Sequence, residues 1–393
     1  MRILFLSPRQ CWPTRSGAKL REYYFARALG ERSELTYLHF TEPGSEPLTR
    51  KELPFCREVA AIPKPAPYGA ANLVRGVVGK WPVSILNYTS PEMSAAVQRF
   101  TSAAPFDLIH LDSIHMMRYA NGASKVVYNW HNIESEAMQR YSATVSSRAR
   151  SVYAHLTASK LAALERQILK TALGHIVCSD REKDELRRIE PSARVAVVEN
   201  GVAVSGFPET AASSKIIFVG LMDYYPNIEA ATSFTQGIWP RVREKFPELT
   251  LWIVGANPVP AVKELGTLPG VTVTGTVPDV RPYYRDALSA IVPLRTGGGT
   301  RLKILEAMAA GVPVISTPLG AEGLAVTPGK DILLTEPDDA EGWLRHLSDV
   351  VDDKDQRAHL VQAALELTRT RYDWEILGRK LFETYEDWLQ GRE

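Results

Sequence analysis

The chain has 393 residues, and its 46 lysines and arginines nearly balance 45 aspartates and glutamates, for a formal net charge of +1. A hydrophobic share of 45% excludes a largely disordered protein, and the balanced charge argues against bulk nucleic-acid binding. At roughly 150 residues per domain, the length suggests two or three domains.

The cysteines and the apolar runs indicate the cellular compartment of the protein. Cys11, Cys56 and Cys178 are too few and too scattered for a disulfide framework, and none forms a CxxC pair, so neither disulfides nor a zinc site are expected. No stretch approaches the roughly 18 apolar residues of a membrane span, and the first apolar run is too short for a signal-peptide core. We therefore expect a cytoplasmic protein.

Short runs rich in Val, Ile and Leu predict strands, and longer helical patterns separate them. The expected strands cover residues 3–7, 35–39, 107–111, 126–130, 175–178, 195–198, 216–219, 251–254, 271–274, 290–294, 312–316 and 332–334. Residues 63–67, with three prolines, are expected to be a short stiff loop. Runs without polar alternation are typical of parallel strands covered on both faces, so the pattern predicts an α/β fold with two doubly wound, Rossmann-like lobes.

The join between the lobes is expected near residues 199–208, where Gly and Pro precede a polar stretch. This gives an N-terminal lobe over residues 1–205, a C-terminal lobe over 206–372 and a terminal segment over 373–393. One wide apolar face is expected on a last helix, at Trp374, Leu377, Leu381, Phe382, Tyr385, Trp388 and Leu389. That helix should pack across a lobe, such as the N-terminal one, or bridge both.

Residues 291–316 read as strand, glycine-rich loop, helix, Gly311 stop and strand. The glycines at 297–299 (Gly297, Gly298 and Gly299) allow a backbone to approach an anion closely, and Thr300 is the expected N-cap of the helix. Arg301 and Lys303 add positive charge on the following turn. The segment therefore predicts a diphosphate cradle, although a bare glycine triplet alone would indicate only a flexible turn with solvated cations.

Other nucleotide motifs fit less well. A dinucleotide fingerprint lacks its third glycine, because Leu302 stands there, and no acid follows the next strand. Glu306 lies on the same helix among apolar neighbours, which favours a carboxylate that accepts both ribose hydroxyls over a solvent-facing one. Asp112 is a single carboxylate at a strand end, so no metal ion or other cofactor is expected.

The segment from Gly297 to Ser316 resembles the nucleotide-sugar site of glycosyltransferase family 4, whose members are retaining enzymes of the GT-B fold. Further resemblances cover residues 16–19, 130–134, 197–202, 219–227, 251–255 and 273–279, and so nearly the whole chain. The resemblance implies two Rossmann-like lobes facing a cleft, with the acceptor on the N-terminal side and the donor on the C-terminal side.

The resemblance also implies individual roles. Glu306 matches the second Glu of the family's motif and would hold the ribose, whereas the first Glu is replaced by Gly298. His131 would contact the donor sugar, and Gly17 would let the first loop approach sugar and phosphate. Because the first loop of the C-terminal lobe lacks a cation, Arg301 and Lys303 are our candidates for neutralising the leaving diphosphate. Further donor contacts are expected at Gly220, Val277 and Glu322.

The resemblance implies a retaining enzyme, and we expect transfer of a sugar from a UDP- or GDP-sugar to a hydroxyl acceptor. A nucleotide-sugar epimerase of the same architecture and a non-catalytic nucleotide-binding homologue are the alternatives. A polysaccharide, a lipid-linked or other growing glycan, a natural product and a protein all stay open as acceptors. Basic residues in segments 71–86 and 147–173 could also touch an anionic membrane at the inner face, although ordinary core packing with a solvated charged face is the favoured explanation.

Overall fold

The computed structural model describes residues 1–392 apart from 15, 67–69, 121–124, 146, 206, 208–213 and 298–300. Internal contacts divide the chain into two compact units. Unit 1 comprises Met1–Glu199 and Leu377–Glu393, and unit 2 comprises Asn200–Ile376.

Unit 1 is built on a parallel sheet whose described strands follow the order β3-β2-β1-β4-β5-β6-β7. The strands are β1 (Arg2–Ser7), β2 (Glu34–Thr41), β3 (Glu58–Pro63), β4 (Leu108–Leu111), β5 (Val126–Asn129), β6 (Gly174–Val177) and β7 (Val195–Val197). The helices are α1 (Gly17–Gly30), α2 (Ala70–Val78), α3 (Val83–Leu86), α4 (Pro91–Ala103), α5 (Glu134–Thr144), α6 (Arg148–Thr171), α7 (Asp180–Ile189) and α15 (Trp374–Leu389).

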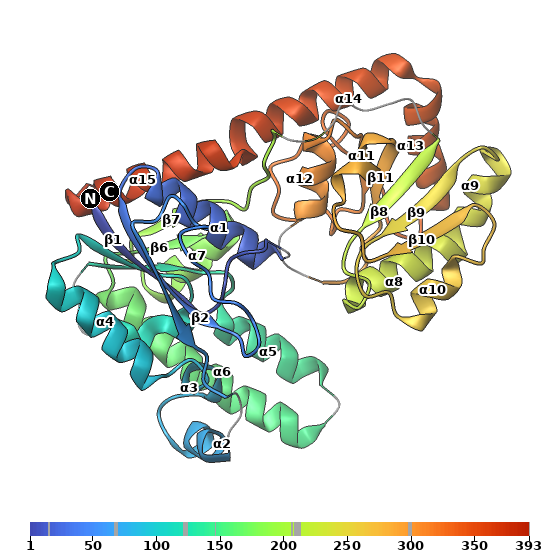
Figure 1. Cartoon of the computed structure of the whole chain (residues 1–393). Helices are drawn as coiled ribbons and strands as arrows, with labels where there is room; N and C mark the ends of the chain where they lie inside the picture. Colours follow the sequence, from blue (N-terminus) through green and yellow to red (C-terminus); the bar gives the residue numbers. More distant parts are fainter. Residues whose placement is uncertain are drawn as a thin grey trace. The chain divides into compact units, whose positions relative to one another are not determined.

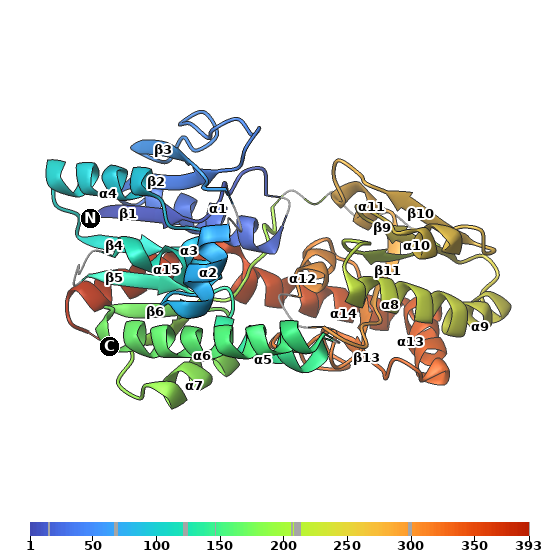
Figure 2. The same ribbon diagram turned by 90° about the horizontal axis from the view of Figure 1, so that it is seen from below.

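Successive side chains of each central strand point to opposite faces of this sheet, as in every β-strand. Leu4 and Leu6 of β1 join a core with side chains of α4 and α6. Phe5 points to the opposite face, where it stacks on His110 and where α1 and α15 pack. Figures 1 and 2 show helices on both sides of the sheet. This confirms the predicted doubly wound lobe.

The strand β3 corrects the sequence analysis, which expected only a stiff loop at residues 63–67. Pro63 is the last residue of β3 and lies opposite Thr41 of β2. Proline is tolerated there because β3 is an edge strand, so one side of its backbone needs no ladder partner.

Unit 2 repeats the architecture with the strand order β10-β9-β8-β11-β12-β13. The strands are β8 (Lys215–Val219), β9 (Thr250–Val254), β10 (Val271–Gly275), β11 (Ala287–Val292), β12 (Val314–Ser316) and β13 (Leu333–Leu334). The helices are α8 (Tyr225–Ser233), α9 (Trp239–Lys245), α10 (Pro260–Leu265), α11 (Arg281–Arg285), α12 (Leu302–Ala309), α13 (Ala340–Asp352) and α14 (Lys354–Leu367). Both units are therefore Rossmann-like.

The last helix, α15, covers the bounds expected from its apolar face. Its first turn belongs to unit 2, where Trp374 N donates to Val202 O, and from Leu377 onwards it belongs to unit 1. There Tyr385 Oη lies 2.6 Å from His110 Nδ1, and Trp388 covers Gly174 so closely that a Cβ on that glycine would lie 2.4 Å from the indole. The helix thus completes the core of unit 1.

Within the described ranges, no helix combines the length and the apolar character needed to cross a bilayer. The same residues contain no group of three His, Cys, Asp or Glu side chains placed to hold a metal ion.

Candidate functional site

The predicted phosphate-binding residues of unit 2 lie where its strand order reverses. The strand β8 has β9 on one side and β11 on the other, so the carboxyl ends of β8 and β11 flank a topological switch point. Open parallel sheets bind ligands at this position. Gly220 directly follows β8, and α12 follows β11, so the fold brings both segments to that edge.

Lys303 is the centre of this cluster. Its Nζ donates to Asn227 Oδ1 at 2.6 Å and lies 4.6 Å from the centre of the Phe218 ring. Burial, with a smaller contribution from the charge of Arg301, lowers the pKa of Lys303 to about 7. A Cβ on Gly220 would stand 2.7 Å from Asn227 Nδ2 and 3.1 Å from Nζ, so a larger residue there would displace the Asn227 amide that holds the lysine.

Glu306 lies one turn further along α12, on the same side as Lys303. The hydroxyl of Tyr284 is 3.3 Å from Glu306 Oε2 and 3.3 Å from Lys303 O. Burial raises the pKa of Glu306 to about 7, although the Tyr284 hydroxyl and the charge of Lys303 oppose the shift. An acid and a base with similar pKa values therefore lie side by side, which is typical of functional sites.

Arg301 carries a buried guanidinium with few partners. Its side chain is only 6% exposed, and Nη2 lies 3.5 Å from Glu322 Oε2 and 3.4 Å from Gly297 O. None of the described residues offers its buried Nε a hydrogen-bond acceptor. Burial lowers the pKa of Arg301. A buried donor without an acceptor is costly, so this site favours an incoming anion.

The helix α12 begins directly after the predicted cradle loop. Its N-cap residue is Arg301, whose backbone is non-helical. Gly298, Gly299 and Thr300 themselves lie outside the described residues. Gly297 has a φ of +100°, and a Cβ on it would lie 2.7 Å from Pro226 Cγ, so glycine is required on both counts.

Two further predicted donor contacts are placed less centrally. Glu322 joins the cluster through Arg301, but its side chain is 63% exposed. Val277 follows β10 and packs, half-buried, against the core of unit 2. Near it, the charge of Asp279 contributes to the raised pKa of Glu306, which places the loop after β10 within electrostatic reach of α12.

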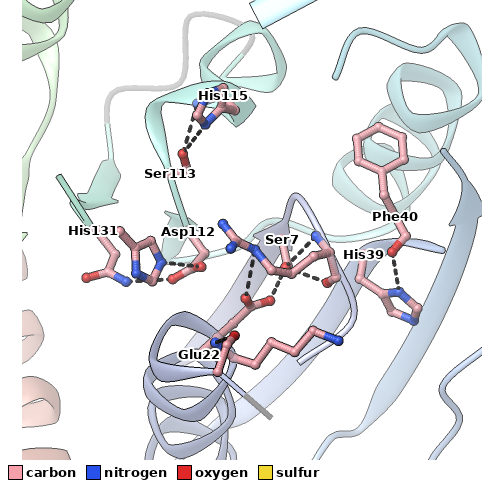
Figure 3. Close-up of polar contacts among 12 residues, drawn as sticks. Ser7, Glu22, His39, Phe40, Asp112, Ser113, His115 and His131 are labelled. Carbon is pink, nitrogen blue, oxygen red and sulfur yellow. Dashed lines mark hydrogen bonds and ion pairs between the residues drawn. The ribbon is translucent and has the colours of Figure 1, made fainter. Parts of the chain in front are cut away.

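Unit 1 has a second polar cluster at its own switch point, at the carboxyl ends of β1, β4 and β5 (Figure 3). His131 Nε2 lies 2.9 Å from Asp112 Oδ2, and Asn129 Nδ2 donates to Asp112 Oδ1 at 2.6 Å. Burial alone would raise the pKa of Asp112, but the charge of His131 and the hydrogen bonds outweigh it and hold the pKa well below its usual range. Asp112 therefore orients the His131 ring as a carboxylate.

A second buried carboxyl in this cluster, Glu22 of α1, has the opposite tendency. The Ser7 hydroxyl donates to its carboxyl group (Figure 3). The Tyr37 hydroxyl donates to the same group at 2.6 Å, and Arg9 Nε lies 3.7 Å away. Burial and the negative charge of Asp112 raise the pKa of Glu22 well above its usual value. Gly17, the predicted loop glycine, is the first residue of α1, and Ser16 caps the helix.

Sequence reasoning missed several members of these clusters, among them Glu22, Asn129, Asn227 and Tyr284. Asp112 was considered only as a lone carboxylate. One signal could have found its pairing with His131: both residues follow strands that come one after the other, and parallel neighbours end at the same edge of a sheet. No comparable signal marks Glu22 or Tyr284, because each lies within a helix whose register is fixed by packing.

Comparisons with known proteins match both halves of the chain. The family model described as Glycosyltransferase Family 4 matches residues 17–205, and the model described as Glycosyl transferases group 1 matches residues 213–353. A phosphatidyl-myo-inositol mannosyltransferase from Mycolicibacterium smegmatis is 24% identical over 312 residues, which cover 75% of each chain.

Solved structures show the same fold. Sucrose-phosphate synthase from Thermosynechococcus elongatus superposes with a TM-score of 0.71 at 18% identity, over 100% of both chains. Anabaena HepE in complex with UDP and glucose gives a TM-score of 0.67 at 15% identity, over 98% of this chain and 99% of that one.

Proposed function

Because the chain belongs to the glycosyltransferases of family 4 and group 1, enzymes of the GT-B fold, we propose that it transfers a sugar from a nucleotide diphosphate donor to a hydroxyl acceptor, with retention of anomeric configuration. The observation that carries the proposal is the cationic cluster at the start of α12. Arg301 has a buried Nε for which none of the described residues offers an acceptor, and Lys303 lies on the same helix.

In the proposed reaction the bond between the anomeric carbon and the diphosphate breaks, and negative charge develops on the leaving phosphate oxygens. Arg301 and Lys303 stabilise that charge from fixed positions, so little reorganisation is needed at the moment of reaction. A single preorganised donor of this kind typically contributes about 2.7–4 kcal/mol to lowering the barrier. The acceptor oxygen forms the new bond to the anomeric carbon on the face from which the phosphate leaves, and the departing phosphate takes the acceptor proton. This front-face attack requires neither an enzymic nucleophile nor a metal ion.

The ribose of the nucleotide is assigned to Glu306. Its carboxylate lies beyond the cations along α12, where two acceptor oxygens suit two neighbouring hydroxyls. Gly298 stands where the family's motif has its first Glu, so no carboxylate at this position can orient the donor sugar. We assign that role to backbone groups and to other polar side chains. In unit 1, His131 held by Asp112 is suited to bind a sugar hydroxyl.

A UDP-sugar is our first choice of donor, because the HepE structure that superposes on this chain contains UDP and glucose. The acceptor is proposed to be a hydroxyl of a glycan or of a lipid-linked molecule, since the mannosyltransferase relative is named for phosphatidyl-myo-inositol.

Calorimetric titration with UDP, GDP and ADP tests the site. One nucleotide should bind preferentially, and Glu306→Ala should weaken it by about 1.5–3 kcal/mol, the usual contribution of hydrogen bonds to a charged group. Glu264→Ala, at an exposed position on α10, is the matched control and should bind like the parent protein. Equal affinity of Glu306→Ala and the parent would remove the ribose assignment.

A further inference from the structure

Basic side chains gather where strands of the sheet in unit 1 end. Arg9 follows β1, Lys64 follows β3, His115 follows β4 and His131 follows β5. The carboxyl ends of parallel strands share one edge of a sheet, so the fold brings all four to that edge. Burial and the charges of the other three lower the pKa of His115 to about 4. The other three side chains are therefore within electrostatic reach of His115, and we call the four residues the basic cluster.

Tyr88, a half-buried residue just after α3, lies among the members of the basic cluster. Lys64 Nζ is 4.9 Å from the centre of its ring, and the centre of the His115 ring is 5.0 Å away. Burial would lower the pKa of Arg9, but two carboxyl groups and then Tyr88 outweigh it and raise this pKa. Lys64 Nζ also donates to Glu42 Oε1 at 2.5 Å, which leaves its ammonium two further protons to donate.

Arg9 keeps hydrogen-bond donors available for a ligand. Its side chain is 32% exposed, and Nε lies 3.7 Å from Glu22 Oε2, beyond hydrogen-bond distance. Because burial raises the pKa of Glu22, this carboxyl group gives the guanidinium only part of a counter-charge. Asp112, the other buried carboxyl group of the site, is engaged with His131 and Asn129. The planar fork of Arg9 therefore suits the oxygens of an incoming anion.

Ser113 orients the ring of His115 (Figure 3). Its Oγ accepts from the backbone N–H of His115 at 3.2 Å and lies 2.6 Å from Nδ1 of the same residue. Because the pKa of His115 is low, the imidazole is neutral at neutral pH. The Ser113 hydroxyl then donates to Nδ1, and the ring proton stays on Nε2. The ring is half-buried, so this N–H is a further donor for a ligand.

We propose that the basic cluster binds a phosphate monoester group of the acceptor. The inference rests on the proposed sugar transfer, because it assigns the phosphate to the molecule that receives the sugar. A monoester has three terminal oxygens, which match donors from separate strand ends: a guanidinium fork, an ammonium and an imidazole N–H. Like charges gathered at one edge also raise the local concentration of an anionic ligand. A carboxylate, with two oxygens, fits fewer of these donors, and a neutral acceptor gains from none of the charges.

Calorimetric titration of the full chain with inorganic phosphate, glucose 6-phosphate, glucuronate and glucose tests the proposal. Glucose 6-phosphate should bind at least about tenfold more tightly than glucose, which corresponds to about 1.4 kcal/mol. Arg9→Gln and Lys64→Gln should each weaken its binding about tenfold, because each removes one charged donor. Arg9→Lys keeps the charge and loses the fork, so it should weaken binding less than Arg9→Gln. Added salt should weaken binding in the parent protein.

Arg99→Gln on α4 and Lys51→Gln change exposed residues of the same types in unit 1. These matched controls should bind glucose 6-phosphate like the parent protein. Circular dichroism of Arg9→Gln and Lys64→Gln should also match the parent, which separates loss of binding from loss of fold. Titration in the presence of saturating UDP keeps the two anion sites apart, because UDP fills the proposed nucleotide site of unit 2 and the sugar phosphate should still bind.

The outcomes separate this proposal from the proposed function. A parent protein that binds UDP but neither phosphate probe would overturn the phosphate site and leave the sugar transfer intact. Displacement of glucose 6-phosphate by UDP, variants of the basic cluster that bind like the controls, or tighter binding of glucuronate would also overturn it. A protein that binds glucose 6-phosphate but no nucleotide would support the phosphate site and contradict the donor assignment instead.

Discussion

Lys303 and Glu306 lie one turn apart on α12 with pKa values that burial moves towards each other, to about 7. In the free protein Lys303 is therefore partly deprotonated at neutral pH. A bound diphosphate stabilises the charged ammonium and so raises the pKa of Lys303. Nucleotide binding is then coupled to proton uptake, and Lys303 by itself weakens affinity as pH rises above about 7.

Glu306 acts in the opposite direction, because ionisation of its carboxyl above pH 7 improves its hydrogen bonds to ribose. Glu306→Gln removes this second titration. The negative charge of Glu306 raises the pKa of Lys303, so in this variant Lys303 of the free protein loses its proton below about pH 7. UDP affinity should therefore fall with rising pH, by up to about tenfold per unit, from below pH 7 upwards. Calorimetry in two buffers of different ionisation enthalpy measures the proton uptake. In Lys303→Met combined with Glu306→Gln the uptake should vanish, and uptake that persists there would assign it to another group.

Asp112 determines which nitrogen of His131 carries the proton. Its carboxylate accepts from Nε2, which leaves Nδ1 as the acceptor when the ring is neutral. In Asp112→Asn the new amide can donate to Nε2 instead and reverse the tautomer. We expect ¹⁵N chemical shifts of labelled His131 to report this reversal. The activation free energy of sugar transfer should rise by about 0.5–1.5 kcal/mol, the contribution of one hydrogen bond. An unchanged tautomer would limit Asp112 to a structural role.

At the scale of elements, the strand ends β8 and β9 approach each other through two glycines. Gly255 has a φ of +152°, and a Cβ on it would lie 1.7 Å from Gly220 O. Gly255→Ala should therefore push the two loops apart, displace Gly220 from Lys303 and lower both stability and UDP affinity, with a loss of about 1–3 kcal/mol from overpacking alone. Urea unfolding and calorimetry measure the two effects.

Gly329→Ala is the matched control for Gly255→Ala. Gly329 also has a positive φ, of +78°, but a Cβ there meets no atom within 4 Å. The substitution should cost about 1–2 kcal/mol of backbone strain and leave UDP affinity unchanged. Equal losses of affinity in both alanine variants would show that general destabilisation, and not the contact with Gly220, weakens binding.

How far sequence predicts each element depends on its burial. Central strands read clearly because both of their faces are apolar, and the glycine stop of α12 at Gly311 follows from its positive φ. The edge strand β3 was missed because it is half-exposed, contains two alanines and ends in Pro63, which all weaken the apolar run.

At the scale of the molecule, sequence predicted two lobes and left open whether α15 packs across one lobe, such as the N-terminal one, or bridges both. Its apolar face fits any complementary surface, and the choice follows from three-dimensional detail. Gly174 on β6 leaves room for the Trp388 ring, and His110 on β4 lies within hydrogen-bond distance of Tyr385. The polar clusters have the same origin, because Tyr284 meets Glu306 and Glu22 meets Ser7 only after the chain folds.

Each unit has its own core, so their stabilities should respond separately to substitution. Trp388 belongs to α15 and packs on β6 of unit 1, whereas Trp343 is buried in unit 2 against Phe234, with ring centres 5.0 Å apart. Replacing either tryptophan by alanine should cost about 3–5 kcal/mol. In hydrogen-exchange mass spectrometry, Trp388→Ala should speed exchange in β4 and β6 and leave β8 and β11 protected, while Trp343→Ala should do the reverse. If Trp388→Ala speeds exchange equally in both sheets, the two units unfold together, and α15 couples the free energies of unfolding of the two units.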